Sequence, residues 1–410
     1  MSLSKHKYTP SYDFPQELLS EIFKRLPVKY VLRCRAVQKS WYSLIKTPMF
    51  ISLHSNYQKL TAHINPKYLL FDNLDTELFT VRFDNAQCQE YCTFDYDLPN
   101  SSWYAQSNGL ICVSTMFDQH FDFDPDIYLW NPLVQKYRMV PETPLRRYSF
   151  EETKWHALAF GFLPEAKDYV VVHMVKPSLT SAPDEPEYPY DESYELYSHL
   201  VMISVYSRNS NSWKEMCQEK VFVDRMCTDK SVFVNGTAFW VGYNSNELYQ
   251  VVMCFDTETN VLRTIRVPNW IEIHGRQILN PRILPFGQSI AYFVEVDQED
   301  VDEDDDENDA PHLDIWVLKD NMMGEFSWVK KMSVGLSENV WARVLGLRNN
   351  GEPILAKSNN LISYNLDTHE PYDFVESCDR LTPNYVYEEG SSSPFVISPF
   401  VETLLFLDTD

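Results

Sequence analysis

Residues 12–50 are the only clearly helical stretch of the chain, and everything after them has the texture of β-structure. Apolar side chains recur at three- and four-residue steps between Leu18 and Leu26, and charged side chains fill positions between them. This pattern is typical of an amphipathic helix with one buried face. Pro15 suits a first helical turn, where its missing N–H is not needed, and Asp13 is a plausible cap.

Prolines divide this stretch into short helices. The first is expected to end at Leu26-Pro27, because the residue before a proline avoids the α region. A second helix is expected to begin at Pro27 and a third at Lys39, and Pro48 is expected to close the unit. Three short helices cannot bury much surface by themselves, so the unit needs a partner, which is either the rest of the chain or another protein.

The residues in this stretch agree in order and spacing with a known module. The agreement covers Phe14-Pro15, Leu18-Leu19, Ile22-Phe23, Arg25-Leu26-Pro27-Val28-Lys29, Leu32-Arg33-Cys34, Val37, Lys39-Ser40-Trp41, Leu44-Ile45 and Phe50. The stretch resembles the F-box, and in particular its plant version. Two positions differ from the usual pattern, because Phe14 stands where the family usually has leucine and Gln38 where it often has cysteine.

In the F-box family this unit docks onto Skp1 within an SCF-type (Skp1–cullin–F-box) E3 ubiquitin ligase. The resemblance therefore implies an apolar docking surface that fits into a groove of the partner. Burial of its apolar side chains on binding would supply the free energy of docking. The expected Skp1-binding residues are Phe14, Pro15, Leu18, Leu19, Ile22, Leu26, Pro27, Leu32, Val37 and Trp41. The same side chains also hold the helices together, and the sequence does not separate the two roles.

Composition limits the class of protein. A length of 410 residues with 44% hydrophobic and 14% aromatic residues is enough for a sizeable core in one large domain or two smaller ones. No run of about eighteen apolar residues occurs, and the N-terminal residues lack the apolar core of a signal peptide. We therefore expect no membrane partner, a cytoplasmic or nuclear location, and a flexible arm over residues 1–11.

The net charge of −24 argues against nucleic acid as a partner, because phosphates require a basic face. Much of the charge is concentrated near residues 295–311, where the run DVDEDDDENDA lacks the glycine and the closing glutamate of a calcium loop. A second insertion, near residues 176–195, is rich in proline and acidic residues. Both are predicted to be long surface loops.

From about residue 68 onward, short apolar runs alternate with turn residues. The predicted strands are Tyr68–Phe71, Leu110–Ser114, Ile127–Trp130, Tyr169–Val175, Leu200–Tyr206, Ser231–Val234, Ala238–Tyr243, Gln250–Phe255, Ser289–Val294, Leu313–Leu318, Ile354–Ala356, Leu361–Asn365 and Thr403–Leu407. The Asn-Gly pairs at Asn108, Asn235 and Asn350 are strong signals for tight turns.

A repeat lies within this region. Each copy is a strand that ends in an aromatic residue, followed by a polar turn and a second strand, and the aligned aromatics are Trp130, Tyr206, Phe255, Trp316 and Tyr364. With the strand that precedes several copies, each repeat offers about four strands per fifty residues, which is the period of a propeller blade. We expect the repeated aromatics to be core residues between blades rather than an aromatic ligand cage.

The β-rich region also carries motifs of a known kind. They are Ser107-Asn108-Gly109-Leu110-Ile111-Cys112, Leu129-Trp130-Asn131-Pro132, Phe160-Gly161-Phe162, Asp168-Tyr169, Val205-Tyr206-Ser207, Ser212-Trp213-Lys214, Cys254-Phe255-Asp256, Asp314-Ile315-Trp316-Val317-Leu318 and Ser327-Trp328. Neither the Gly-Gly pair of standard kelch repeats nor the Trp-Asp pair of WD40 repeats occurs. Together the motifs resemble the kelch-like F-box-associated region of plant F-box proteins, in the branch that includes the S-locus F-box proteins of pollen.

No catalytic, cofactor-binding or metal-binding constellation stands out. The chain has no G-x-S-x-G elbow, H-E-x-x-H motif, P-loop or G-x-G-x-x-G loop. The pair Cys88 and Cys92 lacks a second pair at zinc-ligand spacing, and the eight scattered cysteines are most simply buried thiols. His156, beside Trp155, is interpreted as a core or loop histidine. We therefore expect a protein that is not itself an enzyme.

The sequence thus predicts an α+β multidomain chain, with a three-helix F-box over residues 12–56 and a mostly antiparallel, propeller-like β domain over residues 60–406. By resemblance, the chain is the substrate receptor of an SCF-type ligase. Its partners would be a Skp1-like adaptor, a cullin through that adaptor, and an unidentified protein substrate, for which the acidic charge of the chain favours a basic protein. The alternatives are a pollen factor that recognises S-RNases, an F-box scaffold or inhibitor outside a ligase, and a propeller enzyme.

Overall fold

The structure is a computed structural model of the whole chain. It describes residues 14–61, 67–73, 78–95, 101–115, 126–147, 153–177, 200–218, 221–223, 225–244, 249–268, 279–296, 312–320, 325–335, 343–357, 360–375 and 395–407. The predicted arm, the cap Asp13 and most of both predicted acidic insertions lie outside these residues.

Four helices open the described chain. They are α1 (Gln16–Phe23), α2 (Val28–Cys34), α3 (Lys39–Ile45) and α4 (Pro48–Leu60). The expectation that Pro48 ends the helical region was wrong, because this proline occupies the first turn of α4, where no N–H is needed. The Thr47 hydroxyl accepts a hydrogen bond from the Phe50 amide at 3.2 Å and caps the new helix.

Apart from one 3-10 helix at Pro144–Arg147, the described elements that follow are strands. They are β1 (Tyr68–Asn73), β2 (Leu78–Phe83), β3 (Glu90–Asp95), β4 (Ser101–Ser107), β5 (Leu110–Thr115), β6 (Asp126–Asn131), β7 (Lys136–Met139), β8 (Thr153–Leu163), β9 (Asp168–Pro177), β10 (Val201–Ser207), β11 (Ser212–Gln218), β12 (Arg225–Val234), β13 (Thr237–Asn244), β14 (Tyr249–Asp256), β15 (Val261–Arg266), β16 (Leu279–Phe286), β17 (Ser289–Val296), β18 (His312–Asp320), β19 (Phe326–Gly335), β20 (Arg343–Leu347), β21 (Pro353–Lys357), β22 (Asn360–Asn365), β23 (Glu370–Val375) and β24 (Phe395–Phe400). The predicted strand Thr403–Leu407 was wrong, because β24 ends before it.

The strands form six four-stranded modules, in which neighbouring strands are consecutive in the chain except for the pair β24 and β1. Four modules are separate sheets, namely β4–β7, β8–β11, β12–β15 and β16–β19. The eight-stranded sheet consists of two more, β20–β23 and β24-β1-β2-β3, which meet only at the parallel pair Gly346 and Ile397. The first strands contact one another in the cyclic order β24, β4, β8, β12, β16, β20 and back to β24. This arrangement is that of a propeller and confirms the predicted fold class.

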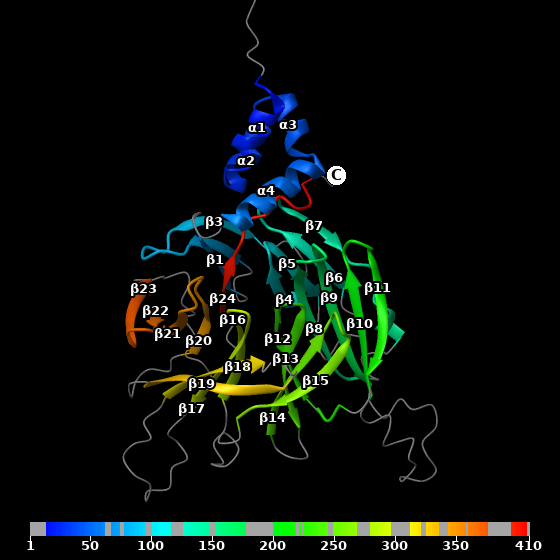
Figure 1. Cartoon of the computed structure of the whole chain (residues 1–410), viewed down its shortest axis with the longest axis vertical. Helices are drawn as coiled ribbons and strands as arrows, with labels where there is room; N and C mark the ends of the chain where they lie inside the picture. Colours follow the sequence, from blue (N-terminus) through cyan, green and yellow to red (C-terminus); the bar gives the residue numbers. More distant parts are fainter. Residues whose placement is uncertain are drawn as a thin grey trace, which may run out of the picture. The chain divides into compact units, whose positions relative to one another are not determined.

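One module is built from both ends of the β domain. Strand β24 pairs antiparallel with β1 over six residue pairs, from Tyr68 with Phe400 to Asn73 with Phe395. In Figure 1 the red arrow of β24 lies beside β1, although most of the chain separates the two strands. The two ends of the β domain therefore close the ring by hydrogen bonding to each other.

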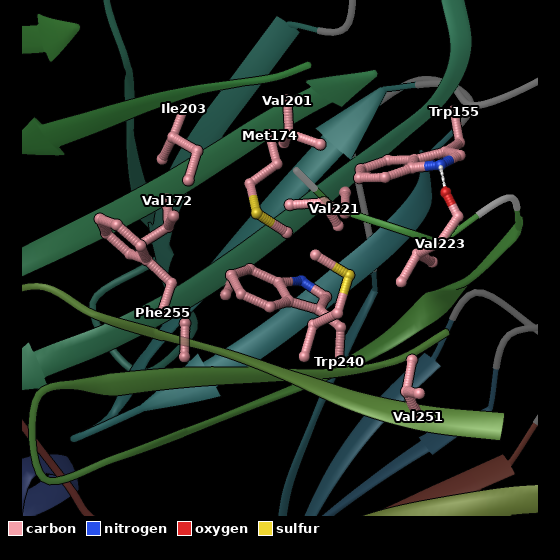
Figure 2. Close-up of a cluster of buried hydrophobic side chains, with 14 residues drawn as sticks. Trp155, Val172, Met174, Val201, Ile203, Val221, Val223, Trp240, Val251 and Phe255 are labelled. Carbon is pink, nitrogen blue, oxygen red and sulfur yellow. Dashed lines mark hydrogen bonds between the residues drawn. The ribbon is translucent and has the colours of Figure 1, made fainter. Parts of the chain in front are cut away.

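Large aromatic side chains pack between neighbouring modules. Figure 2 shows the cluster that joins the β8–β11 module to the β12–β15 module, with Trp240 fully buried at its centre. The Trp240 indole donates to the Leu158 carbonyl at 2.8 Å, and the Trp155 indole donates to the Val223 carbonyl at 3.3 Å. Each indole therefore satisfies its N–H while it buries its ring.

Four of the five repeated aromatics are buried core residues at the ends of third strands, as expected; these are Trp130, Tyr206, Phe255 and Tyr364. The exception is Trp316. This residue lies in the middle of β18 and is only half buried, with Lys330 Nζ at 5.7 Å from the ring centre. Its assignment to the aligned set was wrong by several residues.

The polar residue after the aromatic opens the turn between the third and fourth strands. Side-chain oxygens of Asn131, Asp256 and Asn365 each accept two main-chain N–H groups from residues two and three positions later. This bonding is an Asx turn. The fourth residue after each has a positive φ, namely Gln135, Asn260 and His369. The repeated polar residue therefore forms the turn between the third and fourth strands of these modules.

The contact that joins the two halves of the eight-stranded sheet leaves no room for a side chain. A Cβ on Gly346 would lie 1.7 Å from the main-chain oxygen of Ile397. We expect Gly346→Ala to lower the free energy of unfolding by about 1–3 kcal/mol, because backbone must move. Urea denaturation checks this. Gly335→Ala, where nothing lies within 4 Å, is the matched control, and equal midpoints for both variants would contradict the account.

Two buried histidines make stability depend on pH. His156 and His173 stack with ring centres 5.6 Å apart, His156 Nδ1 lies 3.3 Å from His173 Nε2, and Thr143 Oγ1 lies 3.1 Å from His173 Nδ1. Burial lowers the pKa of His156 to about 4 and that of His173 well below its usual value. Both rings are therefore neutral in the folded protein at neutral pH.

The histidines of the unfolded chain bind protons near pH 6.5, whereas those of the folded protein do not. The contribution of the pair to the free energy of unfolding is therefore fully present above pH 6.5 and is lost as the pH falls toward 4. His156 alone should cost about 2 kcal/mol between pH 7.5 and pH 5. Urea midpoints at the two pH values measure this loss. A His156→Gln, His173→Gln variant should show a smaller difference, and an unchanged wild-type midpoint at pH 5 would contradict the prediction.

Candidate functional site: an apolar surface on the helices

The helices form one compact unit with two segments from far along the chain. This unit contains residues 1–65, 131–136 and 401–410, and the second unit contains residues 66–130 and 137–400. The sequence predicted a helical module over residues 12–56 but not the two distant segments. We use the name helical unit for the first group.

Three aromatic rings hold the helices together. The Phe23 ring of α1 contacts Trp41 of α3 and Phe50 of α4 edge-on, at centre distances of 5.0 and 6.5 Å. Val28 and Val31 of α2 are fully buried. These contacts assign Phe23 and the half-buried Trp41 to the packing of the unit, so substitution of Trp41 would disturb folding as well as any docking.

The end of α1 is held by α4. The Leu26 carbonyl accepts hydrogen bonds from His54 Nε2 at 2.9 Å and from Gln58 Nε2 at 3.3 Å, and Gln58 also donates to the Lys24 carbonyl. Burial lowers the pKa of His54, which keeps the ring neutral with its proton on Nε2. Carbonyls that the helix itself cannot satisfy are thereby paired.

The structure divides the ten predicted docking residues into three groups. Phe14, Leu18, Ile22 and Val37 are exposed, with 57, 45, 45 and 65% of their surface accessible. Pro15 is also exposed, Leu19 is buried, and the half-buried residues are Leu26, Pro27, Leu32 and Trp41.

The exposed group has a regular geometry. Phe14, Leu18 and Ile22 are four residues apart, so they lie on one face of α1 and its entry. Such a row of large apolar side chains in water is costly unless a partner covers it. We refer to Phe14, Leu18 and Ile22 as the α1 stripe.

Exposed aromatic and apolar side chains outside the predicted set also lie on the helices. Tyr30, Tyr42 and Met49 are all largely exposed. The Tyr42 ring has Arg35 at 5.1 Å and Lys46 at 5.4 Å, and hydrogen bonds from these two groups lower the pKa of its hydroxyl. The helical spacing of apolar residues identifies the buried face of a helix. It therefore gave no signal for these three side chains, which are exposed to solvent.

The charge of the helices is opposite to that of the chain. Residues 14–61 contain eight lysines and arginines but two acidic residues, whereas the whole chain carries −24. Glu17 and Glu21 are those two. Glu21 contacts Lys24 at 2.5 Å and Arg25 at 3.6 Å, and the hydrogen bond from Lys24 lowers its pKa. The helices therefore carry a net positive charge, although their two carboxylates lie on α1 next to Leu18 and Ile22 in the sequence.

Several motif residues of the β domain have structural roles. Asn108 and Gly109 both have positive φ, as a type I′ hairpin turn requires. The Tyr169 hydroxyl donates to the Asn108 carbonyl at 3.0 Å. The Asp168 carboxylate accepts from the Ser207 hydroxyl at 2.6 Å and from the Asn209 amide at 2.9 Å. These motifs fix turns and the contact between modules.

The described residues contain no group of three or more metal-ligating side chains. Among these residues, Cys88, Cys112 and Cys254 are buried thiols, and burial raises the pKa of Cys254 to about 12. Within the described part of the chain, none of the helices has the length and apolarity to cross a membrane.

Packing and exposure on α1 predict different results for two positions of the same helix. We expect Phe23→Ala to destabilise the helical unit by about 3–5 kcal/mol, because it removes a ring buried between three helices. Leu18→Ala, on the exposed face of the same helix, should cost less than about 0.5 kcal/mol. Hydrogen exchange of helical amides measures both, and equal protection in the two variants would contradict the assignment.

Comparison with known proteins gives two family matches. Residues 12–53 match the family described as the F-box domain, and residues 68–369 match the F-box associated beta propeller domain. The second match spans most of the chain.

The chain is also similar to several F-box proteins of Arabidopsis thaliana. The chain is 28% identical to F-box protein At5g49610 over 63% of its own length and 66% of that protein. It is 24% identical to F-box protein At1g47340 over 84% of the chain and 70% of that protein. It is 22% identical to F-box protein CPR1 over 86% of the chain and 82% of that protein. The chain thus spans about two thirds of the length of the first two relatives.

Proposed function

The chain belongs to the F-box proteins that carry an F-box associated beta propeller domain, and we propose that it is the substrate-recognition subunit of an SCF-type E3 ubiquitin ligase. In this role the helical unit docks on a Skp1-like adaptor, the adaptor brings a cullin, and the β domain captures a protein substrate. The chain itself is not the enzyme, since ubiquitin transfer belongs to the partners and the receptor contributes proximity.

The observation that carries the proposal is the α1 stripe. Leu18 and Ile22 lie on α1, and Phe14 lies just before it; the adjacent face of the helix is packed through the buried Leu19 and Phe23, which fixes the orientation of the stripe. An apolar helix face with four-residue spacing is suited to a hydrophobic groove. Val37, the most exposed of the predicted residues, extends the apolar surface beyond α1.

The surrounding charge specifies the partner further. The net positive charge of the helices as a whole favours an adaptor whose docking surface has an acidic rim. Such charges act mainly on the rate of encounter, and salt screens them beyond about 8 Å at physiological ionic strength. Docking should therefore weaken in high salt but persist, because burial of apolar surface supplies most of the free energy.

The strand order supports a substrate surface at one end of the ring. The two acidic insertions connect β9 to β10 and β17 to β18, which are the second and third strands of their modules. In an antiparallel module this end lies opposite the Asx turns, which connect third and fourth strands. The acidic composition of these two segments favours a basic protein substrate by electrostatic steering.

Substitution of the α1 stripe tests the proposal. We expect the wild-type chain to bind a Skp1-type adaptor and, through it, a cullin. A Leu18→Glu, Ile22→Glu variant should bind the adaptor at least about a hundredfold more weakly, because charges would enter the groove. Leu60→Glu, at another exposed apolar position, is the matched control and should bind normally.

Affinity of the purified proteins is measured by calorimetry or surface plasmon resonance, with the β-domain melting transition as the folding control. Equal affinity of the double variant and the wild type would contradict the docking surface. Adaptor binding without cullin recruitment would favour a scaffold or inhibitor over a ligase receptor.

A further inference from the structure

The segment 401–407 is an integral part of the helical unit. Leu404, Phe406 and Leu407 are completely buried, although the segment forms no strand or helix. The Leu407 amide donates to the Leu404 carbonyl at 3.1 Å, and the Leu405 amide donates to the Thr403 hydroxyl at 3.2 Å. The segment is therefore a compact turn whose apolar side chains have left water.

This segment contacts two of the helices through polar groups. The Val28 amide, at the first position of α2, donates to the Glu402 carboxylate at 3.4 Å. The Thr403 and Ser55 hydroxyl oxygens lie 3.5 Å apart, and Ser55 belongs to α4. The first amides of a helix have no intrahelical acceptor, and a carboxylate there also favours the helix dipole. Glu402 thus caps α2 from far along the sequence.

Asn131 holds the same segment from the other side. Its Nδ2 donates to the Thr403 carbonyl at 2.9 Å and to the Leu405 carbonyl at 2.7 Å, and the side chain is fully buried. Its Oδ1 meanwhile makes the Asx turn that Asp256 makes with a carboxylate in another module. Because aspartate is sufficient for the turn, the amide group at position 131 serves the segment.

These contacts place two residues behind the docking surface without exposing them on it. Asn131 and Glu402 are both buried, so a partner on the α1 stripe would not touch them. We propose that the segment 401–407, held by Asn131, positions α2 and α4 so that the helical unit presents its docking surface in one fixed arrangement. This inference rests on the proposed function, and it adds Asn131 and Glu402 as positioning residues for adaptor binding.

Chemically matched substitutions test the inference in the full chain. Asn131→Asp keeps the oxygen that makes the Asx turn but turns a carboxylate oxygen toward two carbonyls. Asp256→Asn makes the reverse exchange in a turn that does not contact the segment. Glu402→Gln keeps an acceptor for the Val28 amide, whereas Glu402→Ala removes it.

Two readouts are needed, namely adaptor affinity and hydrogen exchange of the α2 and α4 amides. We expect Asn131→Asp and Glu402→Ala to weaken adaptor binding about tenfold and to speed exchange at Val28 and its neighbours. Glu402→Gln and Asp256→Asn should behave like the wild type. The rescue by glutamine separates positioning from a general loss of packing.

Unchanged adaptor affinity in Asn131→Asp and Glu402→Ala would overturn the inference. If the wild-type chain binds no adaptor, the proposed function fails, and hydrogen exchange then decides the positioning role by itself. In that case faster exchange in α2 and α4 of the two variants supports the role, and wild-type exchange overturns it.

Discussion

The pairing of β24 with β1 is the interaction on which the rest of the structure depends. It closes the ring of modules, and it sets Tyr68 opposite Phe400, so the chain leaves the β domain beside the point at which it entered. The segment that follows Phe400 can therefore reach the helices that precede Tyr68. Closure of the ring is thus a consequence of this antiparallel register.

Much of the β domain could be predicted because its second and third strands are buried and rich in β-branched and aromatic residues. Strands such as β9 and β14 gave clear apolar runs, and Asn-Gly pairs marked the hairpins. Fourth strands such as β15 expose most of their side chains, so they left a weaker pattern. Position 403–407 was mistaken for a strand because its apolar run fills the helical unit instead of a sheet. An apolar run in the sequence indicates that its side chains are buried, but it does not show whether they belong to a strand, a helix or a turn.

The candidate site was predictable in outline but not in detail. Spacing and family resemblance identified the helices and ten apolar positions, and neither distinguishes a side chain that packs from one that docks. Leu19 and Leu18 are neighbours with the same chemistry, yet one is buried and the other is exposed. The roles of Asn131 and Glu402 had no sequence signal, because they depend on contacts between residues hundreds of positions apart.

The central claim is that the helical unit docks a Skp1-type adaptor through apolar surface that is exposed in the free chain. Calorimetric titration of the full chain with the purified adaptor at several temperatures tests it most directly. We expect a one-to-one complex with a negative heat-capacity change, which is the signature of buried apolar area. The absence of binding, or binding with no heat-capacity change, would contradict it.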